Sequence, residues 1–388
     1  MSTASSKPDD TVRALHERLF TIDTHIDTPT ASLMRPGWDF GARHAYAADR
    51  TQCDLPRMAE GGVDAMVFAV YVGQAGRSAE ALAVAHARAV RCFERTHEVL
   101  RANAAACGLA LTADEALRLK AEGRRAIFLS IENAYSVGRD LRNVAKFHGL
   151  GVRMAGLTHM ANNDLADAST DPRGPEWGGL SPLGKEFVAE CNRLGIVLDA
   201  SHASDAVLRD LLEYSRAPVV LSHSGPRAVC DHARNVGDDL LRALAARGGV
   251  LQINALAISL VDDPGNRRTQ AIADVLMKYQ DGVPDDAMLA EEDGDYDRAC
   301  AAWPNPRVSL DDVIRHIEHA VAVMGIDHVG IGFDLDGGGG GFDGLRDVGD
   351  YPNVTRALVA RGWTESQLAQ LWGGNTLRVL RAAEAARG

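Results

Sequence analysis

Short apolar runs alternate along this chain with longer stretches in which apolar residues recur at helical spacing. The runs are rich in β-branched residues, which is typical of buried parallel strands. Eight such strand candidates lie at residues 21–27, 63–72, 126–132, 152–159, 196–202, 218–223, 249–254 and 328–334. The spacing between them predicts amphipathic helices, such as 78–106, 182–194 and 310–324. Strand followed by helix, repeated eight times, predicts an α/β fold of the (β/α)8 TIM-like barrel type.

The remaining stretches fit one large domain, and we interpret residues 1–388 as a single (β/α)8 domain. The barrel core spans about residues 19–336, and residues 353–387 predict extra C-terminal helices that pack on it. Residues 261–306 form a long insertion between the seventh and eighth strands. A run of glycines at 337–341 follows the last strand. Because loops at this end of a barrel often shape the substrate pocket, the run is either part of that pocket or a plain surface turn.

Five of the apolar runs end with side chains that can bind a metal ion. The strands of a parallel barrel all point the same way, so these side chains converge on the C-terminal face, where barrel enzymes keep their active sites. Three histidines with two or three carboxylates suit a pair of Zn²⁺ ions, and we predict two Zn²⁺ per chain. The predicted metal ligands are His25, Asp27, Glu132, His202 and His223, and Asp334 ends the eighth strand beside them.

The spacing and setting of these residues support a shared site. His25 and Asp27 are two apart on a strand, so both side chains point to the same side and can bind one metal. Glu132 ends an apolar run, where an unpaired carboxylate would be costly; bridging two cations removes that cost, and a salt bridge to an arginine is the alternative. His202 and His223 end consecutive strands, which lie about 4.8 Å apart, and can share one metal.

Three further residues are candidates for the chemistry. Asp334 could carry a proton to a leaving amine; Asp336 is the alternative, and we favour Asp334 because it comes directly off the strand. His159 ends the fourth strand and could be a metal ligand, a hydrogen-bond donor to the reacting carbonyl or a loop histidine. Arg234 could clamp a substrate carboxylate with its guanidinium, or it could be an ordinary surface arginine.

Charge and composition exclude several classes of partner. The net charge is −12 and no basic cluster appears, which argues against nucleic acid and anionic membrane surfaces as partners. The first ten residues are polar and no apolar run is long enough to cross a bilayer, so we expect neither a signal peptide nor a membrane anchor. The six cysteines lack Cys-x-x-Cys spacing and are predicted to be the reduced thiols of a cytoplasmic protein.

Several short stretches occur in an order that is typical of one family. They are 22–27 (Ile-Asp-Thr-His-Ile-Asp), 150–153 (Leu-Gly-Val-Arg), 157–159 (Leu-Thr-His), 200–202 (Ala-Ser-His), 215–219 (Ser-Arg-Ala-Pro-Val), 222–224 (Ser-His-Ser), 233–236 (Ala-Arg-Asn-Val), 328–332 (His-Val-Gly-Ile-Gly) and 375–379 (Asn-Thr-Leu-Arg-Val). Together they resemble the membrane (renal) dipeptidases, which are binuclear zinc peptidases of the amidohydrolase superfamily. The resemblance covers nearly the whole chain and is far more specific than any single motif.

The resemblance implies a metal role for five of the predicted site residues. His25 and Asp27 would hold the first zinc ion. His202 and His223 would hold the second. Glu132 would bridge the two ions, which agrees with its place at the end of an apolar run.

The resemblance also implies how a substrate would be held and cleaved. His159 would polarise the scissile carbonyl or steady the tetrahedral intermediate. Arg234 would bind the C-terminal carboxylate of the substrate, and Asp334 would move the proton. The family further implies tolerance of a D-residue at the C-terminal position and leaves a homodimer open. Residues 254–256 lack the aromatic residue that many members carry there, which leaves the side-chain preference open.

We therefore predict a zinc-dependent dipeptidase that hydrolyses dipeptides with a free C-terminal carboxylate. A hydroxide held between two metals, roughly 3.5–4 Å apart, would attack the peptide carbonyl. One alternative is another hydrolase on the same barrel, such as a lactonase, a deaminase or a conjugate-specific peptidase. A second is a catalytically silent metal-binding maturation factor, against which the intact set of predicted ligands argues.

Overall fold

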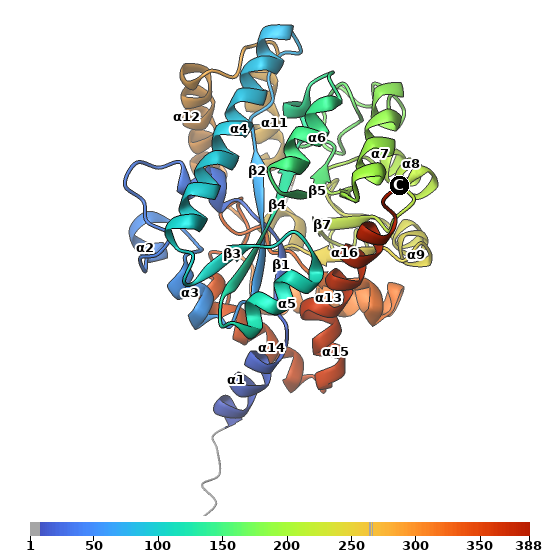
Figure 1. The fold of residues 1–388 in the computed structure, drawn as a ribbon. Coiled ribbons are helices and arrows are strands. Elements are labelled where there is room, and N and C mark those ends of the chain that lie inside the picture. Colours follow the sequence, from blue (N-terminus) through green and yellow to red (C-terminus); the bar gives the residue numbers. More distant parts are fainter. Residues whose placement is uncertain (1–7, 264, 266) are drawn as a thin grey trace, which may run out of the picture.

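The computed structural model describes residues 8–263, 265 and 267–388 of the chain. Eight parallel strands form a ring in the order β1-β2-β4-β5-β6-β7-β8-β9 (Figure 1). A parallel bridge between Ile26 and Leu335 joins the last strand to the first and closes the ring. The strands are β1 (Ile22–Ile26), β2 (Ala65–Tyr71), β4 (Arg125–Glu132), β5 (Val152–Gly156), β6 (Val197–Asp199), β7 (Val220–Ser224), β8 (Val250–Ile253) and β9 (Val329–Ile331). The predicted (β/α)8 barrel is confirmed.

One short strand lies outside the ring and was not predicted. β3 (Cys107–Leu109) pairs in parallel with β4 on its outer side. Three residues are too few to give a recognisable alternation of apolar and polar positions, so the sequence alone carries no signal for this strand.

Helices surround the ring and cover both of its ends. They are α1 (Pro8–Arg18), α2 (Tyr46–Asp49), α3 (Leu55–Glu60), α4 (Ala79–Ala102), α5 (Ala113–Ala121), α6 (Arg142–Gly149), α7 (Pro182–Leu194), α8 (Asp205–Tyr214), α9 (Asp238–Ala246), α10 (Ala257–Leu260), α11 (Arg267–Lys278), α12 (Asp286–Ala302), α13 (Leu310–Met324), α14 (Tyr351–Ala360), α15 (Glu365–Ala369) and α16 (Asn375–Ala385). In Figure 1, α1, α14 and α15 lie at the lower end of the barrel, and α11 and α12 lie at the upper end.

Local sequence signals explain where these helices start and stop. Ser78, Ser181 and Ser204 each accept a hydrogen bond from the backbone N–H three residues later and so begin α4, α7 and α8. Gly195 has a φ of 73° and ends α7, a conformation that glycine adopts without strain. These caps place each helix so that its apolar face packs on the strand ring.

Three strands end earlier than the sequence suggested. β5, β6 and β9 stop three residues before His159, His202 and Asp334 respectively. The backbone then turns, with φ values of 67° at His202 and 62° at Asp334. The prediction that these side chains end strands is therefore wrong in detail, because left-handed residues cannot continue a strand. They still reach the C-terminal face of the barrel, but they do so from turns.

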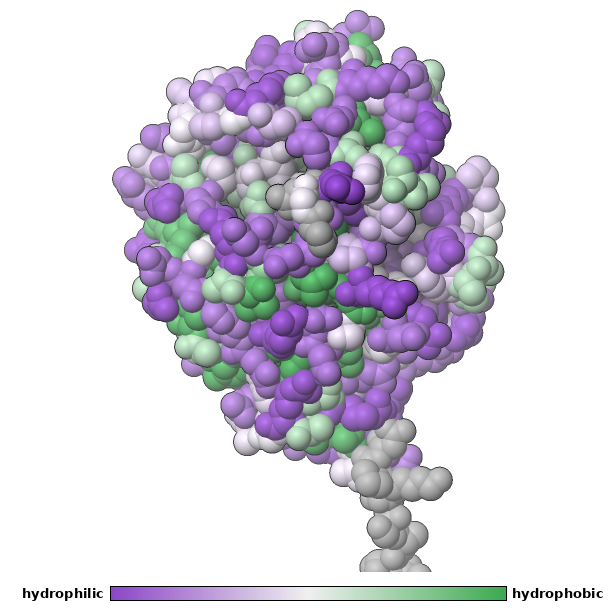
Figure 2. Space-filling model, turned by 180° about the vertical axis from the view of Figure 1, so that it is seen from behind, coloured by the Kyte–Doolittle hydropathy of each residue, from purple (hydrophilic) through white to green (hydrophobic). Residues whose placement is uncertain are grey.

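The surface is mostly hydrophilic on the side seen in Figure 2, where hydrophobic side chains appear only in small groups. This pattern agrees with the net charge of −12. Among the described residues, no helix combines the length and the apolar character needed to span a membrane.

Candidate metal centre

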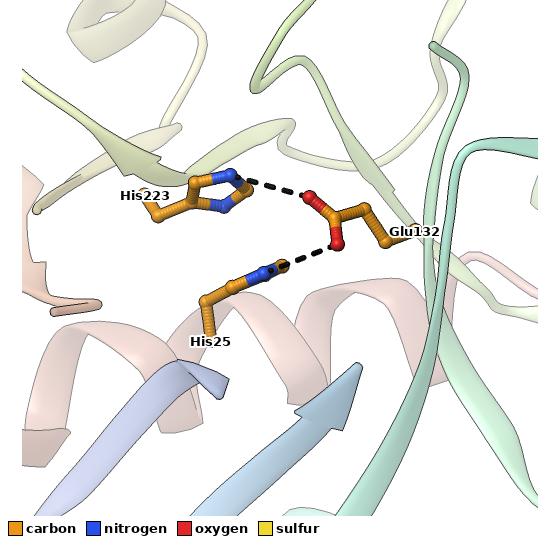
Figure 3. Close-up of side chains that lie close together, drawn as sticks. All are labelled: His25, Glu132 and His223. Atoms are coloured by element: carbon orange, nitrogen blue, oxygen red, sulfur yellow. Dashed lines mark ion pairs between the residues drawn. The ribbon is translucent and has the colours of Figure 1, made fainter. Parts of the chain in front are cut away.

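Side chains from three separate strands meet at the C-terminal face of the barrel. His25 comes from β1, Glu132 ends β4 and His223 lies in β7 (Figure 3). One oxygen of Glu132 lies 3.5 Å from Nε2 of His25, and the other lies 3.5 Å from Nε2 of His223. All three side chains are buried. A carboxylate that turns one oxygen toward each of two imidazoles has the geometry of a bridging group.

The other predicted ligands extend this group on both sides of Glu132. Nε2 of His202 lies 3.1 Å from Oε1 of Glu132 and 2.9 Å from Nε2 of His223. On the opposite side, Nε2 of His25 lies 3.3 Å from Asp27 and 3.9 Å from Asp334. The structure therefore brings together all the residues that the sequence proposed as ligands, in two neighbouring sets of donors.

The donor side chains are better suited to binding divalent metal ions than to hydrogen bonding with one another. Nε2 of His25 is buried and makes no hydrogen bond in the described structure. Burial raises the pKa of Asp27 and of Asp334, and the negative charge of Glu132 raises both further. A cation between these groups would remove both penalties, and mixed imidazole and carboxylate donors are those that zinc prefers.

A hydrogen-bonded relay orients His223. The hydroxyl of Ser222 donates to Oδ2 of Asp199 at 2.6 Å and lies 2.8 Å from Nδ1 of His223. Oδ1 of Asp199 accepts the backbone N–H groups of Ser201 and Ser222, both at 2.9 Å. Because the Ser222 proton goes to Asp199, its oxygen is left to accept the Nδ1 proton of His223. The Nε2 lone pair of His223 then faces Glu132 and is free to bind a metal.

We expect the Ser222→Ala variant to hold metal about 10–100-fold more weakly than the wild type, because the His223 ring loses the partner that sets its tautomer. The matched control is Ser169→Ala, since the buried Ser169 hydroxyl makes no hydrogen bond in the described structure. Competition with a chromophoric chelator measures the affinity. Equal affinities for the two variants would contradict a role for the relay.

A second buried carboxylate, Asp23, ties three parts of the centre together. Its Oδ1 accepts the backbone N–H of His25 at 2.9 Å. Its Oδ2 accepts the N–H of Phe333 at 3.0 Å and the hydroxyl of Tyr351 at 2.5 Å. Asp23 and Asp199 were not assigned a role from the sequence. The signal was present, however, because each is a carboxylate within a fully buried strand.

His159 and Arg234 lie beside the donors. Nε2 of His159 is 3.8 Å from Glu132, and burial together with the charge of Arg234 lowers the pKa of His159 to about 3. The imidazole is therefore neutral and keeps an N–H to donate. Arg234 is only 5% exposed, and its Nη2 donates to the carbonyl of His223 at 3.2 Å. Within the described part of the chain, no carboxylate lies at ion-pair distance from this guanidinium.

The glycine run and Asp336 lie in the wall of the centre. A Cβ on Gly337 would overlap carboxylate oxygens of Asp27 and Asp334, so the run forms part of the wall of the centre. Asp336 accepts hydrogen bonds from Thr28 at 2.6 Å and from the backbone of Gln52 at 2.7 Å. These bonds hold Asp336 in the wall, whereas Asp334 faces His25.

Left-handed backbone conformations gather around the same centre. Five described residues other than glycine have a positive φ. Four of them are Asn133, His202, Asp334 and Asp336, which are centre residues or their close chain neighbours. Asparagine, aspartate and histidine tolerate this conformation better than most residues, but it still costs about 1–3 kcal/mol each.

Comparison with known proteins agrees with this geometry. Residues 9–388 match the family described as membrane dipeptidase, peptidase family M19. The chain belongs to this family. Dipeptidase aclJ of Aspergillus oryzae is 32% identical over 357 residues, which cover 89% of this chain and 75% of that protein. The family and its dipeptidase relatives identify the chain as a metallodipeptidase, a hydrolase of peptide bonds.

Two solved structures of peptidases share the fold. The probable dipeptidase PvdM of Pseudomonas aeruginosa superposes with a TM-score of 0.85 at 29% identity, over 99% of this chain and 100% of that one. A metallopeptidase of Rhodobacter sphaeroides superposes with a TM-score of 0.74 at 25% identity, over 94% of this chain and 99% of that one. The latter was crystallised with a phosphinate mimic of the dipeptide L-Ala-D-Ala.

Proposed function

We propose that this metallodipeptidase uses two zinc ions to hydrolyse dipeptides that carry a free C-terminal carboxylate. The observation that carries the proposal is the buried guanidinium of Arg234, which has no carboxylate partner in the described chain and lies next to the metal donors. A buried arginine without an acid is costly unless a ligand supplies one. A dipeptide supplies a carboxylate one residue away from its scissile bond, whereas a dipeptide amide does not.

Each residue of the centre has a role in this proposal. His25 and Asp27 would hold one zinc ion, His202 and His223 the other, and Glu132 both. When bound, the two ions would supply the hydroxide nucleophile and polarise the scissile carbonyl.

Two more side chains would then serve the reaction directly. The neutral imidazole of His159 would donate a hydrogen bond to the carbonyl oxygen as negative charge develops there. Asp334 would carry the proton to the departing amine. Both groups lie close enough to the donors to act on a peptide held between them.

We further propose that the enzyme accepts a D-residue at the C-terminal position. The support is the Rhodobacter sphaeroides relative, whose bound ligand mimics L-Ala-D-Ala. Binding of the carboxylate by Arg234 does not itself distinguish the L- and D-stereoisomers, because both present the same carboxylate.

A panel of dipeptides tests the function. We expect the zinc-loaded enzyme to cleave L-Ala-L-Ala and L-Ala-D-Ala, to cleave their C-terminal amides poorly, and to lose activity on chelation. Activity on none of these substrates, with zinc restored, would favour the maturation factor. Activity confined to lactones or to one conjugate would favour another hydrolase of the same barrel.

The Arg234→Ala variant is expected to lose about 100-fold or more in kcat/KM on free dipeptides, because it removes one partner of a buried charge pair. The loss on C-terminal amides should be much smaller. Arg227→Ala is the matched control, since Arg227 lies in the same loop but pairs with Asp205 at 3.0 Å. An equal loss on dipeptides and amides would count against the clamp.

A further inference from the structure

The inserted helix α12 lies at the upper, C-terminal end of the barrel, close to α4 (Figure 1). Leu289, Glu292 and Tyr296 share one helix face, at spacings of three and four residues. At one end of this face, a Cβ on Gly73 would lie 2.8 Å from Leu289 and 3.8 Å from an oxygen of Glu292. Gly73 belongs to the loop that leaves β2. Glu292 therefore lies at the edge of the centre, on the β2 side.

Other contacts fasten α12 in this position. The N–H of Gly76 donates to the carbonyl of Gly282 at 2.8 Å, just before the helix. Arg88 of α4 forms an ion pair with Asp286 of α12, and the two helices lie side by side in Figure 1. At the far end, Tyr296 is 37% exposed, yet burial and nearby charges that include Asp334 raise the pKa of its phenol. Tyr296 therefore lies on the side of α12 that faces the centre.

The phenol of Tyr71 lies near both Glu292 and the metal donors. Tyr71 ends β2 and pairs in register with Glu132, and its ring lies 4.5 Å from that of His159. Burial raises the pKa of Tyr71, and the charges of Glu292, Glu132 and Asp27 raise it further. Glu292 and the metal donors thus both lie near Tyr71, although Glu292 does not contact the predicted ligands in the described chain.

Glu292 has no cationic partner. No ion pair or hydrogen bond joins its carboxylate to any residue of the described chain, although it is half-buried. Burial and repulsion by Asp293 raise its pKa to about 7. Glu291, one position earlier, is exposed and pairs with Lys278 at 2.9 Å. A half-buried carboxylate without a partner is costly, and a positively charged ligand would remove that cost.

The order of the strands in the ring indicates which part of a dipeptide would reach Glu292. β7, which precedes Arg234, and β2 stand opposite each other in the ring of eight strands. A substrate whose carboxylate binds Arg234, as the proposed function requires, extends its N-terminal residue toward β2. The side chain of that residue would then lie near Tyr71 and α12.

We propose that α12 forms the pocket for the side chain of the N-terminal residue and that Glu292 selects a cationic one, lysine or arginine. The inference rests on the proposed function. It makes α12 a specificity element of the dipeptidase, with Glu292 as the residue that decides between charged and neutral side chains.

The test compares kcat/KM for Lys-Ala and norleucyl-Ala, which differ only by the terminal ammonium group, each with L- and D-alanine. We expect the wild-type holoenzyme to prefer Lys-Ala by about 10–100-fold, the range of a hydrogen bond between charged groups. Glu292→Gln should remove most of this preference, and Glu292→Lys should shift it toward Glu-Ala. Glu291→Gln, the matched control on the exposed face, should keep the wild-type preference.

The outcomes separate this inference from the proposed function. If the wild type cleaves norleucyl-Ala as well as Lys-Ala, or if Glu292→Gln keeps the wild-type ratio, the pocket assignment is overturned while the dipeptidase stands. If the zinc-loaded wild type cleaves no dipeptide, the proposed function falls and the inference falls with it. Melting temperatures of the variants, compared with the wild type, show that the ratios come from folded protein.

Discussion

Replacing Glu132 with glutamine is expected to remove most of the bound metal and, with it, the dipeptidase activity. One carboxylate oxygen faces His25 at 3.5 Å, and the other faces His202 and His223 at 3.1 and 3.5 Å. A neutral amide would not balance the charge of the two proposed cations. Removing one partner from a buried charged group costs about 3–5 kcal/mol, which corresponds to about 10²–10⁴-fold in metal affinity.

Elemental analysis after dialysis and competition with a chelator would measure this loss. Glu213→Gln is the matched control, because Glu213 is an exposed carboxylate at the end of α8, away from the centre. The bridging role would be refuted by a Glu132→Gln protein that keeps full metal content through dialysis and hydrolyses dipeptides at the wild-type rate.

Replacing Asp334 with asparagine is expected to have a different result, with metal retained and turnover reduced by about 10²–10⁴-fold. The Asp334 carboxylate is 7% exposed, and its Oδ1 lies 3.9 Å from Nε2 of His25. This places it beside the donors, and within the described residues no hydrogen bond occupies its carboxylate. Asparagine keeps the size and the polarity of the side chain but cannot take up and release a proton, so the step that fails is protonation of the leaving amine.

Single-turnover kinetics together with metal analysis would separate the two effects. Asp343→Asn is the control, since Asp343 is exposed in the segment that follows the glycine run. Near-normal turnover by a metal-loaded Asp334→Asn enzyme would exclude Asp334 as the proton carrier. In that case Asp336 would be the next candidate, although Thr28 and Gln52 already occupy its oxygens.

The barrel and the candidate ligands could be predicted from the sequence because the signals are local. Apolar runs mark the strands, and His25, Glu132 and His223 lie within them, so the direction of each strand fixes where its side chain points. The predicted helices at 182–194 and 310–324 agree with α7 and α13 for the same reason. Both signals, the spacing of apolar residues and the capping residues of helices, depend only on residues that are close together in the chain.

The backbone turns and the supporting hydrogen bonds of the centre could not be predicted, because they depend on contacts between residues that are distant in the chain. His202 and Asp334 reach the mouth from left-handed turns beyond their strands, and such turns persist only when the surrounding fold imposes them. Asp23 bonds to the backbone of Phe333, which lies 310 residues further along the chain. Neither kind of contact produces a periodic pattern in the sequence. The packing of α12 beside the loop that follows β2 produces none either.

The left-handed residues around the centre have a consequence for engineering. At positions such as His202 and Asp334 a glycine would relax the backbone, so directed evolution under heat alone would tend to accumulate robust but inactive proteins. A thermostabilised version of this enzyme therefore needs selection that rewards turnover in every round, with mutations steered to the outer helices and away from the turns at the barrel mouth.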